Sequence, residues 1–456
     1  MPWVGVRSAK EYGPISPQNP TALQGLMGTT ASEQGEECLS LNIWTPACDT
    51  AKRPVMVWVH GGAFVTGAGS LGLYNGKALA ASGDVVVVTI NYRLGGLGFL
   101  RLADVTAGTI PSIGNEGLLD QIVALEWVRD NIASFGGDAS NVTIFGESAG
   151  AMSIVALLAC PSARGLFHKA ISQSGGGHIG HSKDHANRIA DVFLNHLGVG
   201  VHDLERTSVE SLLKAQLALI SEIDTQHDPH KLGTLAFQPT VDGAVLPERP
   251  IDAIRKGCAK GVPLIAGTTS EEWKLWTALD AKAQSIDESR LQNWATKMFA
   301  EHASSVLAAG QELSPYDRYV AMQTNRAFRE PTRRLLSAQS VYAPVYEYVF
   351  DWRSPAMGGA FGACHAIELG FVFGSYSMKG PDNFFGTGPG ARELHQSMMD
   401  TWTSFARSGV PAGSWPQWGS ASNRGVVFGK QAQAVQVLNF DAPPAWAKLP
   451  DRLIGS

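Results

Sequence analysis

Ser148 is the residue of this sequence whose surroundings best fit a nucleophile. It is the centre of a G-E-S-A-G pentapeptide at residues 146–150, directly after the β-branched and apolar run at 142–145. A strand that turns sharply into a helix at this serine would leave its Oγ exposed at the helix N-terminus, where backbone N–H groups favour a developing anion. The pattern therefore predicts a nucleophilic serine, and the alternative is an ordinary glycine-rich turn with a solvated serine.

An H-G-G-A-F segment at residues 60–64 ends another apolar run and is rich in small residues. Acyl transfer puts negative charge on a carbonyl oxygen, and backbone N–H groups stabilise it where no side chain blocks their approach. We expect Gly62 and Ala63 to supply two such donors and Ala149, after the nucleophile, to supply a third. The alternative is a glycine turn without a ligand. His60 is expected to pack beside the loop rather than to act as a base.

The general base and its acidic partner are expected later in the chain, in the order serine, acid, histidine. The buried run at 262–266 leads into a loop with two carboxylates, Glu271 and Glu272. Loops at the carboxyl ends of strands are where such sheets place their chemistry. Of the histidines beyond this loop, His365 follows a run of small residues and precedes an apolar segment, whereas the other two lie in helix-like polar stretches. We predict His365 as the base, and a core histidine is the alternative.

Three further histidines, His178, His181 and His185, have spacings of a helical face. Such a face could hold a metal, but a solvated face is the favoured interpretation. No metal or other cofactor is expected.

The elements around these residues alternate between short apolar runs and longer helical patterns. Strands are expected at 39–44, 55–59, 85–90, 141–145, 262–266 and 345–350, and helices at 114–135 and 149–160. Continuous apolar runs are typical of strands buried on both faces, so the sequence predicts an α/β fold with a mostly parallel central sheet covered by helices. Residues from about 275 to 340 have few strand signals and are expected to form a helical, cap-like insertion within one catalytic domain spanning 1–456.

Composition excludes several classes of protein. With 44% hydrophobic and 17% charged residues, a disordered chain is excluded. The net charge of −5 gives no reason to expect a nucleic-acid or anionic-membrane partner. No apolar run approaches the ~18 residues of a membrane span, and no signal-peptide pattern opens the chain. Five irregularly spaced cysteines indicate free thiols in a reducing, cytoplasmic compartment, with a Cys38–Cys48 bridge as the alternative.

A set of ordered motifs resembles the type-B carboxylesterases, the family of the α/β-hydrolase fold that also contains the cholinesterases. The likeness is greatest to bacterial p-nitrobenzyl-esterase-like members. The motifs are E-C-L-S-L-N at 37–42, H-G-G-A-F at 60–64, N-Y-R-L-G at 91–95, G-N-E-G-L-L-D-Q at 114–121, F-G-E-S-A-G at 145–150 and F-V-F-G at 371–374.

The resemblance implies a Ser148, Glu272 and His365 triad. The family's acid loop usually reads G-T-x-x-D-E-G, and here it is G-T-T-S-E-E-W, so Glu272 matches the triad acid. Glu271 stands where aspartate is usual, and Trp273 replaces a glycine. Family members usually begin with several dozen more residues, so the resemblance implies either a later gene start or a shortened N-terminal edge of the sheet.

Further residues are candidates for supporting roles. Glu147 either tunes the field at the site or makes a structural hydrogen bond, and Ser174 resembles the family's serine near the acid. An apolar substrate pocket and ordinary core packing are equally open for several aromatic residues. They are Phe64, Trp273, Trp276 and Phe371.

Together these features predict a serine carboxylesterase that hydrolyses esters of small to medium, largely apolar substrates through an acyl-enzyme on Ser148. Alternatives with the same triad are an amidase or carbamate hydrolase and a lipase-like esterase. A non-catalytic, esterase-like binding protein is a remote alternative, because every triad position is filled. A monomer is favoured.

Overall fold

The computed structural model describes most of the chain. The described residues are Gly5, 8–21, Gly25, 33–224, 235–378, 383–419, 424–429, 435–439 and 444–455. Part of the N-terminal region that bears on the expected short sheet edge lies outside them.

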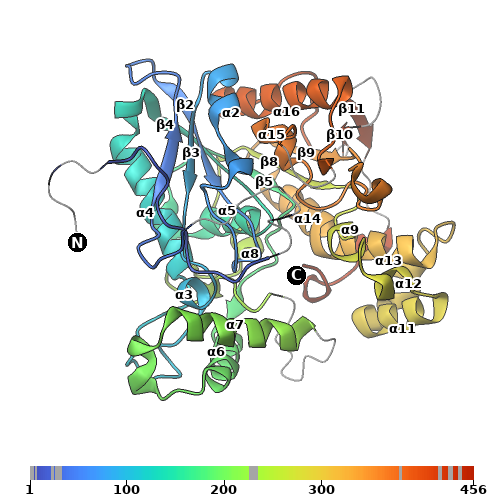
Figure 1. Cartoon of the computed structure of the whole chain (residues 1–456). Coiled ribbons are helices and arrows are strands. Elements are labelled where there is room, and N and C mark those ends of the chain that lie inside the picture. Colours follow the sequence, from blue (N-terminus) through green and yellow to red (C-terminus); the bar gives the residue numbers. More distant parts are fainter. Residues whose placement is uncertain are drawn as a thin grey trace.

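Within the described residues, a nine-stranded sheet forms the centre of the molecule (Figure 1). Its spatial order is β1-β3-β2-β4-β5-β8-β9-β10-β11, with antiparallel pairs only at the two edges, β1 with β3 and β10 with β11. The strands are β1 (Leu41–Trp44), β2 (Arg53–Val59), β3 (Val86–Ile90), β4 (Gly137–Glu147), β5 (Lys169–Gln173), β8 (Leu264–Thr269), β9 (Val345–Phe350), β10 (Arg424–Phe428) and β11 (Val435–Asn439). The predicted mostly parallel sheet is confirmed.

The central strands are buried on both faces. In β2, Val57 enters one hydrophobic cluster and its neighbour Trp58 enters another, and Val88 and Val87 of β3 do the same. Successive strand residues point to opposite faces, so each face needs its own cover. Helices provide this cover on both sides (Figure 1). One side is covered by α4 (Glu116–Asn131), α5 (Ala149–Ala159), α6 (Lys183–Leu197) and α8 (Pro250–Arg255), and the other by α2 (Lys77–Gly83), α15 (Leu369–Phe373) and α16 (Pro389–Ser408).

Every regular element between β8 and β9 is helical. The α-helices are α9 (Lys274–Thr277), α10 (Ala281–Gln284), α11 (Glu288–Phe299), α12 (Ala303–Leu307), α13 (Pro315–Thr324) and α14 (Glu330–Gln339), and a 3-10 turn, Ala300–His302, joins α11 to α12. A π-helical turn, Asn325–Arg329, joins α13 to α14. The remaining α-helices and strands are α3 (Gly95–Phe99), α7 (Val209–Asp224), α17 (Pro444–Ala447), β6 (His181–Ser182) and β7 (Thr240–Val241).

All five cysteines are free thiols, and Cys38 is buried whereas Cys48 is exposed. Among the described residues, no helix combines the length and apolar character needed to cross a bilayer.

Candidate active site

Ser148 lies on a sharp turn between β4 and α5. Its backbone has φ 57° and ψ −125°, a region that residues with a side chain rarely adopt. The Ser148 N–H donates to the carbonyl oxygen of Gln173 in β5, 2.9 Å away, which holds the turn against the neighbouring strand. The side chain is only half-buried, so the hydroxyl stands at the helix N-terminus within reach of a ligand.

The flanking glycines are required by close approach of the backbone of β2. A Cβ on Gly150 would lie 2.1 Å from the carbonyl oxygen of Val59, and one on Gly146 would lie 2.7 Å from the same atom. Real Cβ atoms do not approach backbone this closely, so only glycine fits at either position. The small residues of the motif therefore serve packing of the strand-to-helix turn.

The loop after β2 lies directly against this turn. A Cβ built on Gly61 would be 3.1 Å from the Cβ of Ser148. Gly62 has φ 116° and Ala63 has φ 54°, both in the left-handed region. Among the described residues, no hydrogen bond uses the N–H of Gly62, Ala63 or Ala149. The structure thus brings the loop to the nucleophile turn with donors that are unused.

His60 packs beside the loop that follows β2. Its Nδ1–H donates to the carbonyl oxygen of Gly61 at 2.8 Å, and its ring stacks on Tyr92 with centroids 4.4 Å apart. Burial lowers the pKa of His60 to about 4, so the ring is neutral at physiological pH. Its contacts are those of a packing residue, as the sequence indicated.

Glu272 is fully buried in the loop that follows strand β8, and both of its oxygens accept hydrogen bonds. Oε2 lies 2.6 Å from Nδ1 of His365. Oε1 accepts from the Ser174 hydroxyl at 2.6 Å and from the Thr269 N–H at 2.8 Å. These donors fix the carboxylate that faces the histidine. The neighbouring Glu271 instead pairs with Lys274 at 2.8 Å, so of the two carboxylates Glu272 is the one beside His365.

A second carboxylate approaches the other nitrogen of the histidine. Oε1 of Glu147 is 3.0 Å from Nε2 of His365. Burial lowers the pKa of His365, but the charges of Glu147 and Glu272 more than compensate, and the pKa lies well above its ordinary value of 6.5. No hydrogen bond within the described residues joins Nε2 to the Ser148 hydroxyl. Catalytic hydrogen bonds often close only when substrate binds.

Glu368 is a third buried carboxylate that the sequence analysis missed. Neither of its oxygens has a hydrogen-bond partner among the described residues. Burial, reinforced by the charges of Glu147 and Glu272, raises its pKa, which favours the neutral acid. The signal was a single carboxylate inside the apolar run at 366–373.

Aromatic rings cover the face of His365. Trp276 in α9 has its ring centroid 5.0 Å from the His365 ring, and Phe328 in the π-helical turn is 4.8 Å from it. Trp276 and Phe328 stack on each other, 6.0 Å apart and 6° from parallel. Trp273 packs on Trp276 at 4.9 Å. Because 48% of Trp276 is exposed, these rings form a wall between the histidine and solvent.

Phe64 and Phe371 are placed differently from these rings. Both are fully buried, Phe64 against Phe99 at 4.9 Å and Phe371 against Phe350 at 5.4 Å. This placement fits the alternative of core packing for the two residues.

The histidines at 178, 181 and 185 are held by separate partners. His178 bonds to Asp451, His181 to the carbonyl oxygen of Ala236, and His185 to Arg188. His178 and His181 precede α6, so the three residues do not share a helical face, and the first is buried rather than solvated. Among the described residues, no cluster of side chains fits a metal ion.

A mostly parallel sheet in which a strand turns sharply into a helix at a serine, with an acid and a histidine following in later loops, defines the α/β-hydrolase fold. The profile of the carboxylesterase family matches residues 1–442. The chain belongs to this family, and it is a carboxylic ester hydrolase.

Named relatives and solved structures agree with this assignment. The para-nitrobenzyl esterase of Bacillus subtilis is 40% identical over 91% of this chain and 83% of its own length. The phenmedipham hydrolase of Pseudarthrobacter oxydans is 35% identical over 95% and 87%. A crystal structure of a Geobacillus stearothermophilus carboxylesterase superposes with a TM-score of 0.84 at 37% identity, covering 98% of this chain and 91% of its own.

Proposed function

We propose that the protein hydrolyses carboxylic esters through an acyl-enzyme on Ser148, with His365 as the general base and Glu272 as its orienting acid. Nε2 of His365 takes the hydroxyl proton as Oγ of Ser148 bonds to the ester carbonyl carbon. The same proton then passes to the departing alcohol oxygen as the ester bond breaks. Water repeats the sequence on the acyl-enzyme, releasing the acid and restoring the serine.

The backbone N–H groups of Gly62, Ala63 and Ala149 would hold the oxyanion. Each such donor contributes about 3 kcal/mol to transition-state stabilisation in enzymes of this type. Glu272 would keep Nδ1 protonated, so that Nε2 is free to accept, and would stabilise the imidazolium that forms.

Two observations support this proposal: the strained backbone of Ser148, and the His365 ring bonded at 2.6 Å to a buried Glu272 that is itself doubly anchored. A carboxylate fixed on Nδ1 leaves the other ring nitrogen for proton transfer. The His365–Glu147 contact at 3.0 Å must open, or share Nε2, when substrate arrives.

The test is the Ser148→Ala variant in a stopped-flow assay with p-nitrophenyl acetate. We expect the burst of p-nitrophenol to vanish and kcat to fall by about 10⁴-fold or more. Ser408→Ala, at an exposed serine of α16, is the matched control and should keep both. A burst retained in Ser148→Ala would refute this nucleophile.

We further propose small to medium, largely apolar substrates. The support is the wall of Trp273, Trp276 and Phe328 beside His365, which offers apolar surface to an acyl or alcohol group. The relative named phenmedipham hydrolase supports carbamates as a second substrate class. A panel of p-nitrophenyl esters, aryl carbamates and anilides distinguishes them, and a higher kcat/KM for the carbamates would reverse the order proposed.

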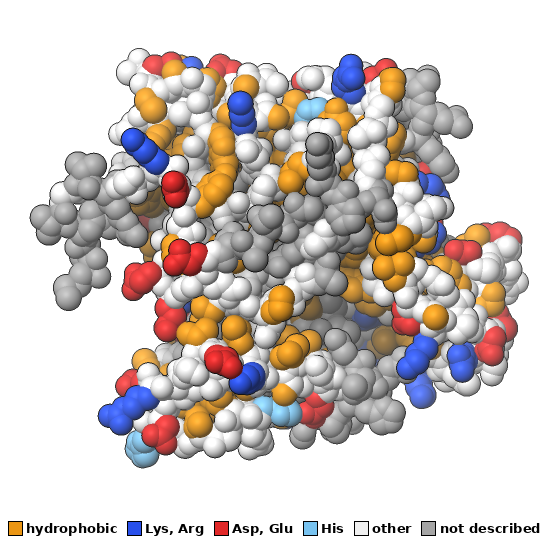
Figure 2. Space-filling view, in the orientation of Figure 1, with side chains coloured by type: hydrophobic (Ala, Val, Ile, Leu, Met, Phe, Trp, Pro, Cys, Tyr) orange, Lys and Arg blue, Asp and Glu red, His pale blue; other side chains and the backbone are white. Residues whose placement is uncertain are grey.

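We also propose that the protein is a monomer and that it is cytoplasmic. We propose that it forms a single catalytic domain, in which residues from about 275 to 340 are a helical insertion over the active site. Five free thiols fit a reducing compartment. On the face shown in Figure 2, both acidic and basic side chains are exposed among the described residues. Light scattering on the purified chain tests the monomer, and a dimer mass would refute it.

A further inference from the structure

A pocket lies against the helical insertion, and its lining contains none of the catalytic residues. It has a volume of about 180 Å³ and lies between α12, α13 and α17, in the helical lobe beyond α9 in Figure 1. Its lining is mainly apolar, with two polar side chains, Arg318 and Asn325. The apolar members are Val306, Ala309, Gly310, Leu313, Ala321, Met322 and Trp446.

Arg318 is the residue whose hydrogen bonding indicates a ligand. It is only 7% exposed, and its Nε–H has no hydrogen-bond partner among the described residues. Its other nitrogens are used, Nη1 on Glu288 at 2.7 Å and Nη2 on the carbonyl oxygen of Leu307 at 2.8 Å. A buried donor without an acceptor costs about 1–3 kcal/mol, and an acceptor in the pocket would remove that cost.

The charge balance specifies the kind of acceptor. Glu288 already neutralises the guanidinium, so a further buried anion would have no counter-charge and would be costly. A neutral oxygen, such as that of an alcohol, ketone or ester, meets the Nε–H without this cost. The remaining surface of the pocket favours an apolar body, and Met322 and Trp446 favour an aromatic ring.

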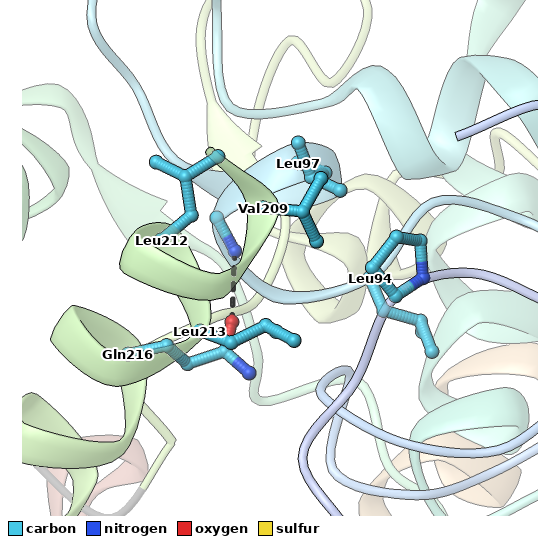
Figure 3. Close-up of a pocket in the computed structure, with 8 residues that line it drawn as sticks. Leu94, Leu97, Val209, Leu212, Leu213 and Gln216 are labelled. Carbon is cyan, nitrogen blue, oxygen red and sulfur yellow. Dashed lines mark hydrogen bonds between the residues drawn. The ribbon is translucent and has the colours of Figure 1, made fainter. Parts of the chain in front are cut away.

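The volume of the pocket limits the size of the ligand. Apolar cavities of about 150 Å³ bind a single benzene ring, so 180 Å³ accommodates a ring with a short polar substituent. A second pocket is much smaller. It lies between α3 and α7, where Leu94 and Leu97 face Leu213 and Gln216, and its volume of about 10 Å³ admits no more than a water (Figure 3).

We propose that the pocket between α12, α13 and α17 is a second binding site, separate from the catalytic centre, for a small neutral aromatic molecule with one oxygen acceptor, bound through Nε–H of Arg318. The lining shares no residue with the catalytic groups, so this inference does not depend on Ser148 being the nucleophile. The site lies on the same continuous helix as Phe328, which packs on His365 at 4.8 Å.

The test follows methionine methyl signals by NMR in the full chain, with benzyl alcohol as the probe. Met322 lines the pocket, and Met152, whose N–H bonds to the carbonyl oxygen of Ser148, reports on the catalytic centre. We expect the Met322 methyl signal, assigned with Met322→Leu, to shift with a Kd of about 1 mM, a value typical of so small a ligand. No shift of this signal up to the solubility of the probe would overturn the proposal.

Variants distinguish the hydrogen bond from simple apolar filling. Arg318→Met should weaken benzyl alcohol about fivefold and leave toluene unchanged, and retained toluene binding shows that the variant is folded. Glu288→Gln keeps the Nε–H and should bind benzyl alcohol as the parent does. Ala321→Leu, which fills the pocket, should lose both ligands. Equal effects of Arg318→Met on the two ligands, or unchanged binding by Ala321→Leu, would contradict the assignment.

Discussion

Glu147 connects the nucleophile turn to the general base, and this position has a kinetic consequence. Its carboxylate raises the pKa of His365, which must be neutral to accept the Ser148 proton. The acidic limb of kcat/KM should therefore lie above pH 6.5 in the parent enzyme. Removing the charge with Glu147→Gln lowers the pKa of His365, so the limb should move to lower pH, as measured with p-nitrophenyl acetate.

The matched control for this shift is Glu271→Gln. Glu271 is also a partly buried carboxylate in the same region, but it pairs with Lys274 and Arg353 rather than with His365. Its neutralisation should leave the acidic limb in place. An unmoved limb in Glu147→Gln would show that this carboxylate does not set the protonation of the base.

Among the secondary-structure elements, the short helix α9 carries an aromatic ring that packs on the general base. It begins two residues after Glu272 and places Trp276 over the His365 ring. Aromatic contacts of this kind contribute about 0.5–1.5 kcal/mol. We therefore expect Trp276→Ala to lower kcat/KM for p-nitrophenyl benzoate by about 3–10-fold.

Trp276→Phe keeps a ring at this position and is the comparison variant, expected to retain most of the activity. For Trp276→Ala, kcat/KM should fall less with p-nitrophenyl acetate than with the benzoate, because the acetyl group is too small to reach across the aromatic wall. Equal losses for both esters would mean that Trp276 acts on His365 alone and does not contact the acyl group.

Strands with continuous apolar runs were predictable, and strands with polar ends were not. The expected strand at 345–350 coincides with β9, and that at 85–90 differs from β3 by one residue. By contrast β5 escaped prediction because its ends are Lys169 and Gln173. Both are buried through partners distant in sequence, Asn141 for the lysine and Trp402 for the glutamine, which no local pattern reveals.

The candidate site divides in the same way. Ser148, the acid loop and His365 follow from local motifs, and the structure brings Glu272 and His365 together. The choice of Glu272 over Glu271 came from family resemblance, since composition and spacing left both open. Phe328 gave no signal, because its place beside His365 depends on how the helical insertion folds back over the sheet.

At the scale of the whole molecule, a cluster of charges around Asp451 joins distant parts of the fold. Its carboxylate bonds to His178, Arg255 and Arg334, residues that belong to three separate parts of the fold. These bonds hold the pKa of Asp451 well below its ordinary value. They tie the last segment of the chain to the body of the enzyme.

Asp451→Asn should therefore lower the free energy of unfolding by about 2 kcal/mol at pH 7, as measured by urea denaturation. Because the folded pKa is depressed, the stabilisation is complete above the unfolded value of about 3.9 and is lost as the pH falls below it. The difference between parent and variant should shrink in that acidic range. A pH-independent difference would show that lost packing, not charge, accounts for the effect.

The positive φ of Ser148 lowers the free energy of unfolding, compared with a glycine at the same position. A side chain in this conformation costs about 1–3 kcal/mol, whereas glycine tolerates it. Substituting Ser148→Gly should therefore give a catalytically dead protein that resists denaturant better than Ser148→Ala, by about 1 kcal/mol, although both lack the hydroxyl. The strained backbone is therefore retained at Ser148, because the glycine that would remove the strain would also remove the nucleophile.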